Sequence, residues 1–299
     1  MKQPLHVTLR AFTVWSWLAA LCVPAVLAAM FFFLLKRGLP GLDATLFFGD
    51  TPVLAAIVHG APVFDGIWPA CLGTLTLVAL ATMLAVPFGV ASGVYLAEMA
   101  SGRCRAFLSL GIELLAGVPS ILMGLFGFAL ILLLRRSVAP EANTGLLLSA
   151  GCLALLVLPY IVHATRLALE SLPANLRLTG ASLGLTTPQT LVRILLPAAL
   201  PGLFSGIVLA VGRIAEDTAV ILLTGAVANA GAPGSLTGKF EALSFTIYYR
   251  AAEYQTPDGL AQAFAVALVL LCLTGLLTAF ARAVQAGLAS ASDTKEAWS

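Results

Sequence analysis

The chain has 299 residues, of which 60% are hydrophobic and 10% charged, and its formal net charge is +2. A soluble domain carries about 25% charged residues. This chain therefore has too few polar side chains to cover a water-facing globule, which argues against a soluble protein. The near-neutral balance gives no indication of nucleic acid binding.

The five cysteines are scattered without a C-x-x-C pair, and the three histidines lie far apart in the sequence. We therefore expect the cysteines to pack as small apolar side chains, with no disulfide framework and no metal site.

Six apolar stretches are long enough to cross the hydrocarbon core, which requires about 20 residues. They are residues 14–35, 70–97, 110–134, 145–169, 196–224 and 259–284. Lys2 and Arg10 precede the first stretch, as in a signal peptide. Its apolar run is too long for one, however, and Lys36-Arg37 occupy the place of a cleavage site. We expect an uncleaved anchor.

Basic residues in short loops mark the cytoplasmic side of a membrane protein. One set of alternate segments carries Lys2, Arg10, Arg103, Arg105, Arg177, Arg193 and Arg282. The opposite set carries Asp43, Asp50, Asp65, Glu253 and Asp258, although Lys36-Arg37 and Arg135-Arg136 there run against the rule. The balance predicts an all-α polytopic membrane protein with six transmembrane helices and both termini in the cytoplasm (N-in/C-in).

The second to fifth stretches are rich in small residues, which let transmembrane helices approach closely. Pro87, Pro119 and Pro159 are expected to kink their helices or to mark local breaks. Kinked, closely packed helices suit a bundle that surrounds a pathway, although packing alone remains an alternative for any single small residue.

The pentad Gly-Ala-Ser-Leu-Gly at residues 180–184 matches the G-x-S-x-G pattern of a hydrolase nucleophile elbow, with Ser182 as the nucleophile. An elbow needs a strand before the serine and a histidine after it in chain order. Here an apolar helical stretch precedes the pentad, and no histidine follows His163. An intramembrane hydrolase that uses Ser182 is therefore an unfavoured alternative.

The segment around this pentad, about residues 171–193, is a long amphipathic loop. Pro173 and Pro188 punctuate it, which predicts a short helix between them and a second helix with Pro188 at an early position. Gly184 lies where a tight turn between the two short helices requires a residue without a side chain. A long, ordered loop of this kind indicates docking of a partner rather than a simple connection.

The segment GLTTPQTLVRILLPAALPG resembles the cytoplasmic EAA loop of ABC-importer permeases, with Gly184, Ile194 and Leu196-Pro197 at the matching positions. Over about residues 66–284, the chain also resembles the PstA-type phosphate permeases. The blocks that carry this resemblance are GIWPACLGTL (66–75), LAGVPSILMGLFGFAL (115–130), LPYIVHATRLALESLPANLR (158–177) and LPAALPGLFSGIVLAVGRIAEDTA (196–219).

The resemblance implies a type I ABC importer transmembrane domain at residues 66–284. It would follow an N-terminal tail, first anchor and outer loop at 1–65, and precede a C-terminal cytoplasmic tail at 285–299. It implies a transport subunit of the inner membrane, not an enzyme, that carries inorganic phosphate. The implied residues of the ATPase coupling loop are Arg177, Gly180, Ser182, Gly184, Pro188 and Pro197.

The implied partners are a second permease (PstC-like), a cytoplasmic ATPase dimer (PstB-like) and a periplasmic phosphate-binding protein (PstS-like). ATP and magnesium would be bound by the ATPase, so no cofactor is expected in this chain. The sequence agrees, because its only Gly-Lys pair, Gly238-Lys239, lacks the surrounding residues of a P-loop.

Two positions depart from the family pattern. Leu178-Thr179-Gly180 replace Glu-Ala-Ala in the loop, and Glu216-Asp217-Thr218 replace Gly-Glu-Thr in the fifth span. These changes leave open how the loop couples. They also leave open a permease for another oxyanion such as molybdate, tungstate, sulfate or phosphonate.

Arg213, Glu216 and Asp217 are expected near the centre of the fifth apolar helix, on one face. Each charge there costs about 2.5–3.5 kcal/mol on insertion scales. Either Arg213 and Asp217 neutralise each other, or the cluster lines the substrate pathway and Arg213 offers its guanidinium to an oxyanion. The resemblance matches Arg213 and Asp217 to a family arginine and acid, whereas Glu216 is an additional charge.

Arg166 in the fourth span is the second candidate for the pathway, with Glu170 four residues later. A salt bridge, or an extended side chain that reaches water at the end of the span, is the alternative.

Overall fold

The computed structural model describes residues 3–59, 61–254 and 257–296, with side chains described for residues 10, 12–59, 61–254 and 259–287. Lys2 and the side chain of Asp258, both used above to predict orientation, lie outside these ranges. Within the described ranges the chain is helical, and its β pairing is limited to an isolated bridge between Ala226 and Phe240. The predicted all-α class is confirmed.

The helices follow the apolar stretches of the sequence, with several short helices between them. In chain order they are α1 (Gln3–Gly38), α2 (Ala44–Phe48), α3 (Val53–Val58), α4 (Trp68–Val94), α5 (Gly102–Ala116), α6 (Ser120–Ser137), α7 (Leu146–Glu170), α8 (Ala174–Ser182), α9 (Thr187–Thr190), α10 (Leu196–Glu216), α11 (Ala219–Thr224), α12 (Leu243–Glu253) and α13 (Pro257–Glu296). A 3₁₀ turn, η1 (Leu39–Gly41), and two π-helical turns, η2 (Tyr95–Met99) and η3 (Leu191–Leu195), complete them.

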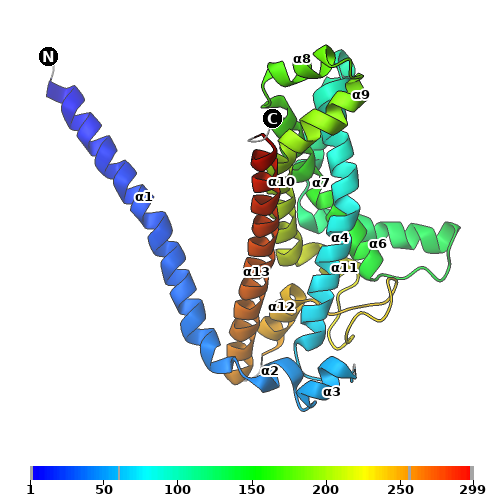
Figure 1. Ribbon diagram of the computed structural model, residues 1–299. Coiled ribbons are helices and arrows are strands. Elements are labelled where there is room, and N and C mark those ends of the chain that lie inside the picture. The colour runs from blue at the N-terminus through cyan, green and yellow to red at the C-terminus, as the bar shows by residue number, and fades with distance from the viewer. Residues whose placement is uncertain (1–2, 60, 255–256, 297–299) are drawn as a thin grey trace.

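Six of the described helical segments are long and apolar enough to cross a membrane, as predicted. The single third span predicted at 110–134 is wrong. α5 ends at Ala116 and α6 starts at Ser120, because the intervening Pro119 adopts an extended conformation and cannot continue a helix. Figure 1 shows α6 projecting sideways from the bundle, at a steep angle to α4. Pro87 and Pro159, in contrast, lie inside the uninterrupted helices α4 and α7.

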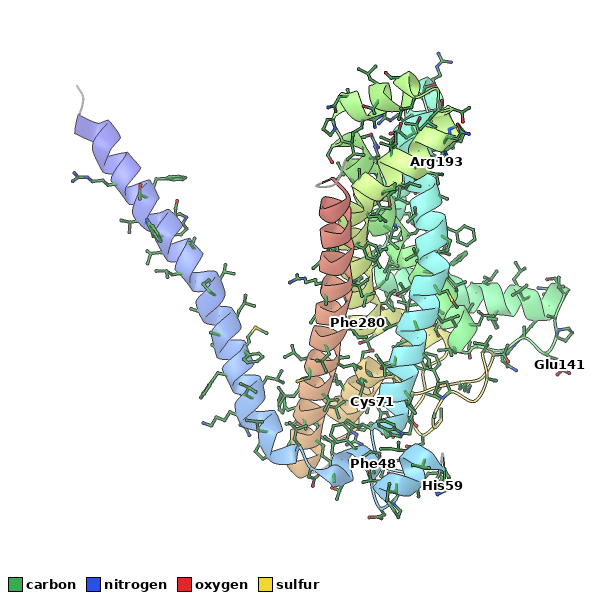
Figure 2. The ribbon with its side chains drawn as sticks, in the orientation of Figure 1. Phe48, His59, Cys71, Glu141, Arg193 and Phe280 are labelled. Atoms are coloured by element: carbon green, nitrogen blue, oxygen red, sulfur yellow. The ribbon has the colours of Figure 1, made fainter. Side chains whose placement is uncertain are left out.

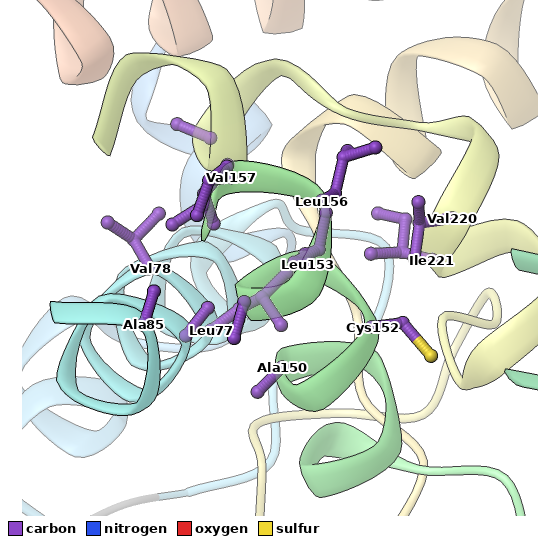
Figure 3. Close-up of a cluster of buried hydrophobic side chains, with 14 of the residues drawn as sticks. Leu77, Val78, Ala85, Ala150, Cys152, Leu153, Leu156, Val157, Val220 and Ile221 are labelled. Atoms are coloured by element: carbon purple, nitrogen blue, oxygen red, sulfur yellow. The ribbon is translucent and has the colours of Figure 1, made fainter. Parts of the chain in front are cut away.

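The core of the bundle is built by α4, α7 and α10, and glycines allow these helices to approach. A side chain on Gly89 of α4 would meet Ile161 of α7 at 2.7 Å. A side chain on Gly206 of α10 would meet Ala164 of α7 at 2.3 Å. These contacts confirm that small residues pack the spans closely. Figure 3 shows part of the apolar core, in which α7 supplies Leu153, Leu156 and Val157.

The first span stands apart from this bundle. α1 meets α13 only near its C-terminal end, where Phe33 makes an edge-to-face contact with Phe264 and Gly38 approaches Leu268. Figure 2 shows side chains radiating from the rest of α1 with no neighbouring helix. The beginning of α1 and the end of α13 lie toward the end of the molecule that carries α8 and α9 (Figure 1).

Candidate functional site

The charged cluster lies at a break in the fifth span. α10 ends at Glu216, and Asp217 takes an extended conformation (φ −73°, ψ 121°) before α11 begins at Ala219. The prediction of one continuous span at 196–224, with the charges near its centre, is therefore wrong. The physical reason is local: the Asp217 carboxylate accepts the backbone N–H of Val220 at 2.9 Å and so caps the new helix. Figure 1 places α11 at mid-height of the bundle.

The three charges do not share one face. The Asp217 side chain is only 2% exposed, whereas that of Arg213 is 42% exposed. Their side chains still pair, with 3.5 Å between Arg213 Nη2 and Asp217 Oδ2. Ser244, at the start of α12, donates to the Asp217 carbonyl at 3.3 Å and ties the break to the next segment. Buried Asp217 therefore stabilises the break between the two helices and pairs with the more exposed Arg213.

Arg213 and Glu216 lie on an exposed stripe of α10. The exposed side chains recur at helical spacing: Ser205, Leu209, Arg213 and Glu216. Among the described residues, Glu216 has no ion-pair or hydrogen-bond partner. Charged side chains inside the membrane face a water-filled cavity or another protein rather than lipid, because exposure to lipid costs several kcal/mol. The stripe therefore marks the side of α10 that a pathway or a partner chain must cover.

The loop at one end of the bundle has the predicted geometry. α8 and α9 flank Gly184, which adopts the left-handed conformation (φ +69°). Pro188 lies in the first turn of α9, and Thr186 and Gln189 form a capping box there. Gly180 packs against Thr190, which a side chain at position 180 would meet at 2.5 Å. The prediction of two short helices around a glycine turn is confirmed.

Several apolar side chains of this loop are exposed. They are Leu178, Leu183 and Val192. Pro197 is exposed in the first turn of α10, and Arg193 extends from η3 at the same end of the molecule (Figure 2).

The Ser182 hydroxyl donates to the carbonyl of Leu178 within α8, an ordinary intrahelical hydrogen bond that gives the serine no catalytic partner.

Arg177 anchors the loop to the bundle. Its Nη2 lies 2.6 Å from Glu98 Oε1 in η2 and 3.0 Å from the carbonyl of Leu169 near the end of α7. The hydrogen bond with Glu98 raises the pKa of Arg177. The sequence analysis did not single out Glu98, because 79 residues separate the partners. The only indication in the sequence was that the Glu98 carboxylate directly follows the second apolar stretch.

Arg166 is engaged in a second ion-pair cluster. Its Nε donates to Glu170 at 2.8 Å, and its Nη1 donates to Ser109 of α5 at 3.1 Å. Arg105 of α5 also pairs with Glu170. The structure does not bring Arg166 into contact with the Arg213–Asp217 pair. These bonds connect α5 to the end of α7. Arg166 therefore forms the salt bridge that was the alternative to a role in the pathway.

A polar cavity of about 380 Å³ lies at the end of the bundle opposite α8 and α9. Glu241 is buried in its wall and accepts the backbone N–H of Gly231 at 2.8 Å. Arg250 donates to Gln262 at 2.9 Å and to the carbonyl of Asp65 at 3.0 Å. The cluster joins α12, α13 and the loops on either side of the core, and no sequence pattern indicated it.

A family model described as "Binding-protein-dependent transport system inner membrane component" matches residues 85–290. The chain belongs to this family, and its six apolar helices make it a multi-pass protein of the inner membrane. The family consists of transport components, which agrees with the prediction of a transport subunit rather than an enzyme.

Among curated relatives, the chain is similar to the permeases named PstA. It is 33% identical over 248 residues to the "Phosphate transport system permease protein PstA" of Haemophilus influenzae, covering 81% of this chain and 82% of that protein. The PstA of Pasteurella multocida is 29% identical and covers 94% of both chains. PstA 1 of Mycobacterium tuberculosis is 38% identical, but the match covers 53% of this chain and spans only half of that protein.

The fold matches that of a chain in the inward-facing MetNI methionine ABC transporter. The TM-score is 0.58 at 18% identity, covering 74% of this chain and 97% of that chain. A second form of the same transporter gives a TM-score of 0.55 at 19% identity, covering 80% and 99%. At this identity the likeness concerns the fold alone. It confirms the predicted transmembrane-domain fold of a type I ABC importer.

Proposed function

We propose that this chain is the PstA-like permease subunit of an ATP-driven importer of inorganic phosphate. The observation that carries the proposal is the guanidinium of Arg213, which lies on the exposed stripe near the end of α10 and pairs with buried Asp217. The names of the PstA relatives support phosphate as the substrate.

Arg213 is suited to an oxyanion in transit. A guanidinium presents several N–H donors in a plane and matches the oxygens of phosphate. Asp217 keeps the net charge of the pair near zero, so an anion can be attracted and then released. We expect the helix bundles to rock, so that Arg213 faces each side of the membrane in turn.

The partners follow from surfaces that the chain leaves open. A second permease (PstC-like) would cover the stripe of α10 and complete the pathway. An ATPase dimer (PstB-like), which binds ATP and magnesium, would dock on the exposed Leu178, Leu183 and Val192 of the loop. A periplasmic phosphate-binding protein (PstS-like) would deliver the anion at the opposite end. In this arrangement α8 and α9 lie in the cytoplasm, with both termini on the same side.

A permease for another oxyanion is the second candidate. It rests on the departure of residues 216–218 from the Gly-Glu-Thr pattern of the phosphate permeases. Sulfate and molybdate have a size and charge similar to those of phosphate, so Arg213 alone does not discriminate among them.

The test is uptake by cells in which this gene is deleted and then restored. We expect the restored gene to recover uptake of radiolabelled phosphate at low external concentration. Excess unlabelled phosphate should compete, whereas excess sulfate or molybdate should not. Loss of sulfate or molybdate uptake in the deletion strain, with phosphate uptake intact, would favour the second candidate and contradict the first.

A further inference from the structure

Glu216 has no structural task in the described chain. It ends α10 on the exposed stripe, without an ion-pair or hydrogen-bond partner among the described residues. The neighbouring Asp217 already caps α11 through Val220 and already pairs with Arg213. A second carboxylate is therefore not required to neutralise Arg213 or to hold the break.

An unpaired carboxylate within a membrane-spanning bundle is costly, and such residues mark sites that handle polar substrates. The cluster of Arg213, Glu216 and Asp217 has a net charge of −1 when all three groups are ionised. A site that only attracts anions gains nothing from this additional charge, whereas a direct contact with the cargo gives Glu216 a role on the pathway side of α10.

The chemistry of that contact is specific. An ionised carboxylate accepts hydrogen bonds and donates none, whereas a guanidinium donates and never accepts. An anion that fits both groups must offer an ionised oxygen to Arg213 and an O–H to Glu216. Phosphate and phosphonate retain a P–OH at neutral pH, whereas sulfate, molybdate and tungstate have no proton to donate.

We propose that Glu216 selects oxyanions that carry an acidic proton, with Arg213 holding an ionised oxygen and Glu216 accepting from the P–OH. This inference rests on the proposed pathway along α10. Sulfate would place lone pairs against the carboxylate, with like charges in contact. A site built to accept a hydrogen bond rejects an analogue that lacks the donor far more strongly than a merely apolar pocket rejects a misfit.

The test measures anion occupancy at this site without the soluble binding protein, which would otherwise select the anion first. The purified transport complex carries Leu209→Cys, on the same stripe and one turn before Arg213. The exposed native cysteines Cys22, Cys104 and Cys272 are replaced by serine. The rate of labelling by a charged thiol reagent is followed against added phosphate and against added sulfate. Ser205→Cys, a smaller change on the same stripe, repeats the measurement if Leu209→Cys does not assemble.

We expect phosphate to slow labelling at a concentration at least about tenfold lower than sulfate. Glu216→Gln, which keeps the shape and adds N–H donors, should bring the two concentrations to within about a factor of two of each other, because sulfate now binds. A preference for phosphate that is unchanged in Glu216→Gln overturns this inference alone. If phosphate protects neither cysteine when Glu216 is present, or protects equally after Arg213→Ala, the proposed pathway itself fails.

Discussion

At the residue scale, the break between α10 and α11 divides the charged cluster between two surfaces. Asp217 turns inward, where it caps α11 and pairs with Arg213, while Arg213 and Glu216 remain on the exposed stripe. Spacing in the sequence placed all three on one helical face, because i, i+3 and i+4 positions are neighbours only while the helix continues. An aspartate inside an apolar run can also cap the start of a new helix. Asp217 in the sequence therefore also favoured a break in the fifth span.

Asp217→Ala should destabilise the break. Loss of the cap should lower the free energy of unfolding by about 1–2 kcal/mol, and Arg213 loses its buried partner at the same time. Asp217→Asn retains an oxygen that can accept from Val220, so it should cost less. Thermal unfolding of the purified complex measures both variants. Equal melting temperatures for Asp217→Ala and the unmodified protein would contradict the capping role.

Glu241 should make stability depend on pH. Burial raises the pKa of this carboxyl, whereas the Gly231 N–H and Arg250 act in the opposite direction. A carboxyl with a raised pKa in the folded state binds its proton more readily there than in the unfolded chain. Its contribution to stability is therefore complete below the unfolded pKa and is lost as the pH rises through the folded pKa.

Glu241→Gln remains neutral and can still accept from Gly231, so it should raise the melting temperature near pH 7 and have little effect near pH 4. Asp50→Asn, at an exposed carboxylate in the loop between α2 and α3, is the matched control and should change neither value. A variant that is less stable than the unmodified protein at neutral pH would show that the Glu241 charge stabilises the fold.

At the element scale, the sequence predicted the loop at 171–193 better than the third span. Proline and glycine act on their own backbone, so Pro188 and Gly184 were sufficient to predict two short helices with a turn between them. The break at Pro119 was named as a possibility, yet hydropathy joined α5 to α6 because both are apolar. The ties of Arg177 to Glu98 and of Arg105 to Glu170 join distant segments, which a single sequence does not reveal.

The turn at Gly184 is open to a direct test. Apart from its two chain neighbours, no atom of the described residues lies within 4 Å of an added Cβ, so a substitution there acts through the backbone conformation. Gly184→Val should cost about 1–2 kcal/mol, since a branched side chain resists a positive φ, whereas Gly184→Asn should be tolerated. We expect Gly184→Val to reduce co-purification of the ATPase and anion-dependent ATP hydrolysis. Equal behaviour of the two variants would argue against a coupling role for this turn.

At the scale of the whole molecule, composition was enough to predict a six-span membrane protein, and the family match agrees. The splayed α1 and the uncovered stripe of α10 indicate a chain that is completed by neighbours. The N-in/C-in orientation and the domain divisions at 65/66 and 284/285 stay predictions. α13 does run unbroken to Glu296, through most of the expected C-terminal tail.

The central claim is that Arg213 binds phosphate in a pathway along α10. The most direct measurement is phosphate uptake by cells that carry Arg213→Ala, with assembly of the complex checked by co-purification. Loss of charge-assisted hydrogen bonds should reduce uptake about tenfold or more with assembly intact. Arg213→Lys should recover only part of it. Arg136→Ala, an exposed arginine at the end of α6, should leave uptake unchanged. Normal uptake by an assembled Arg213→Ala complex would contradict the claim.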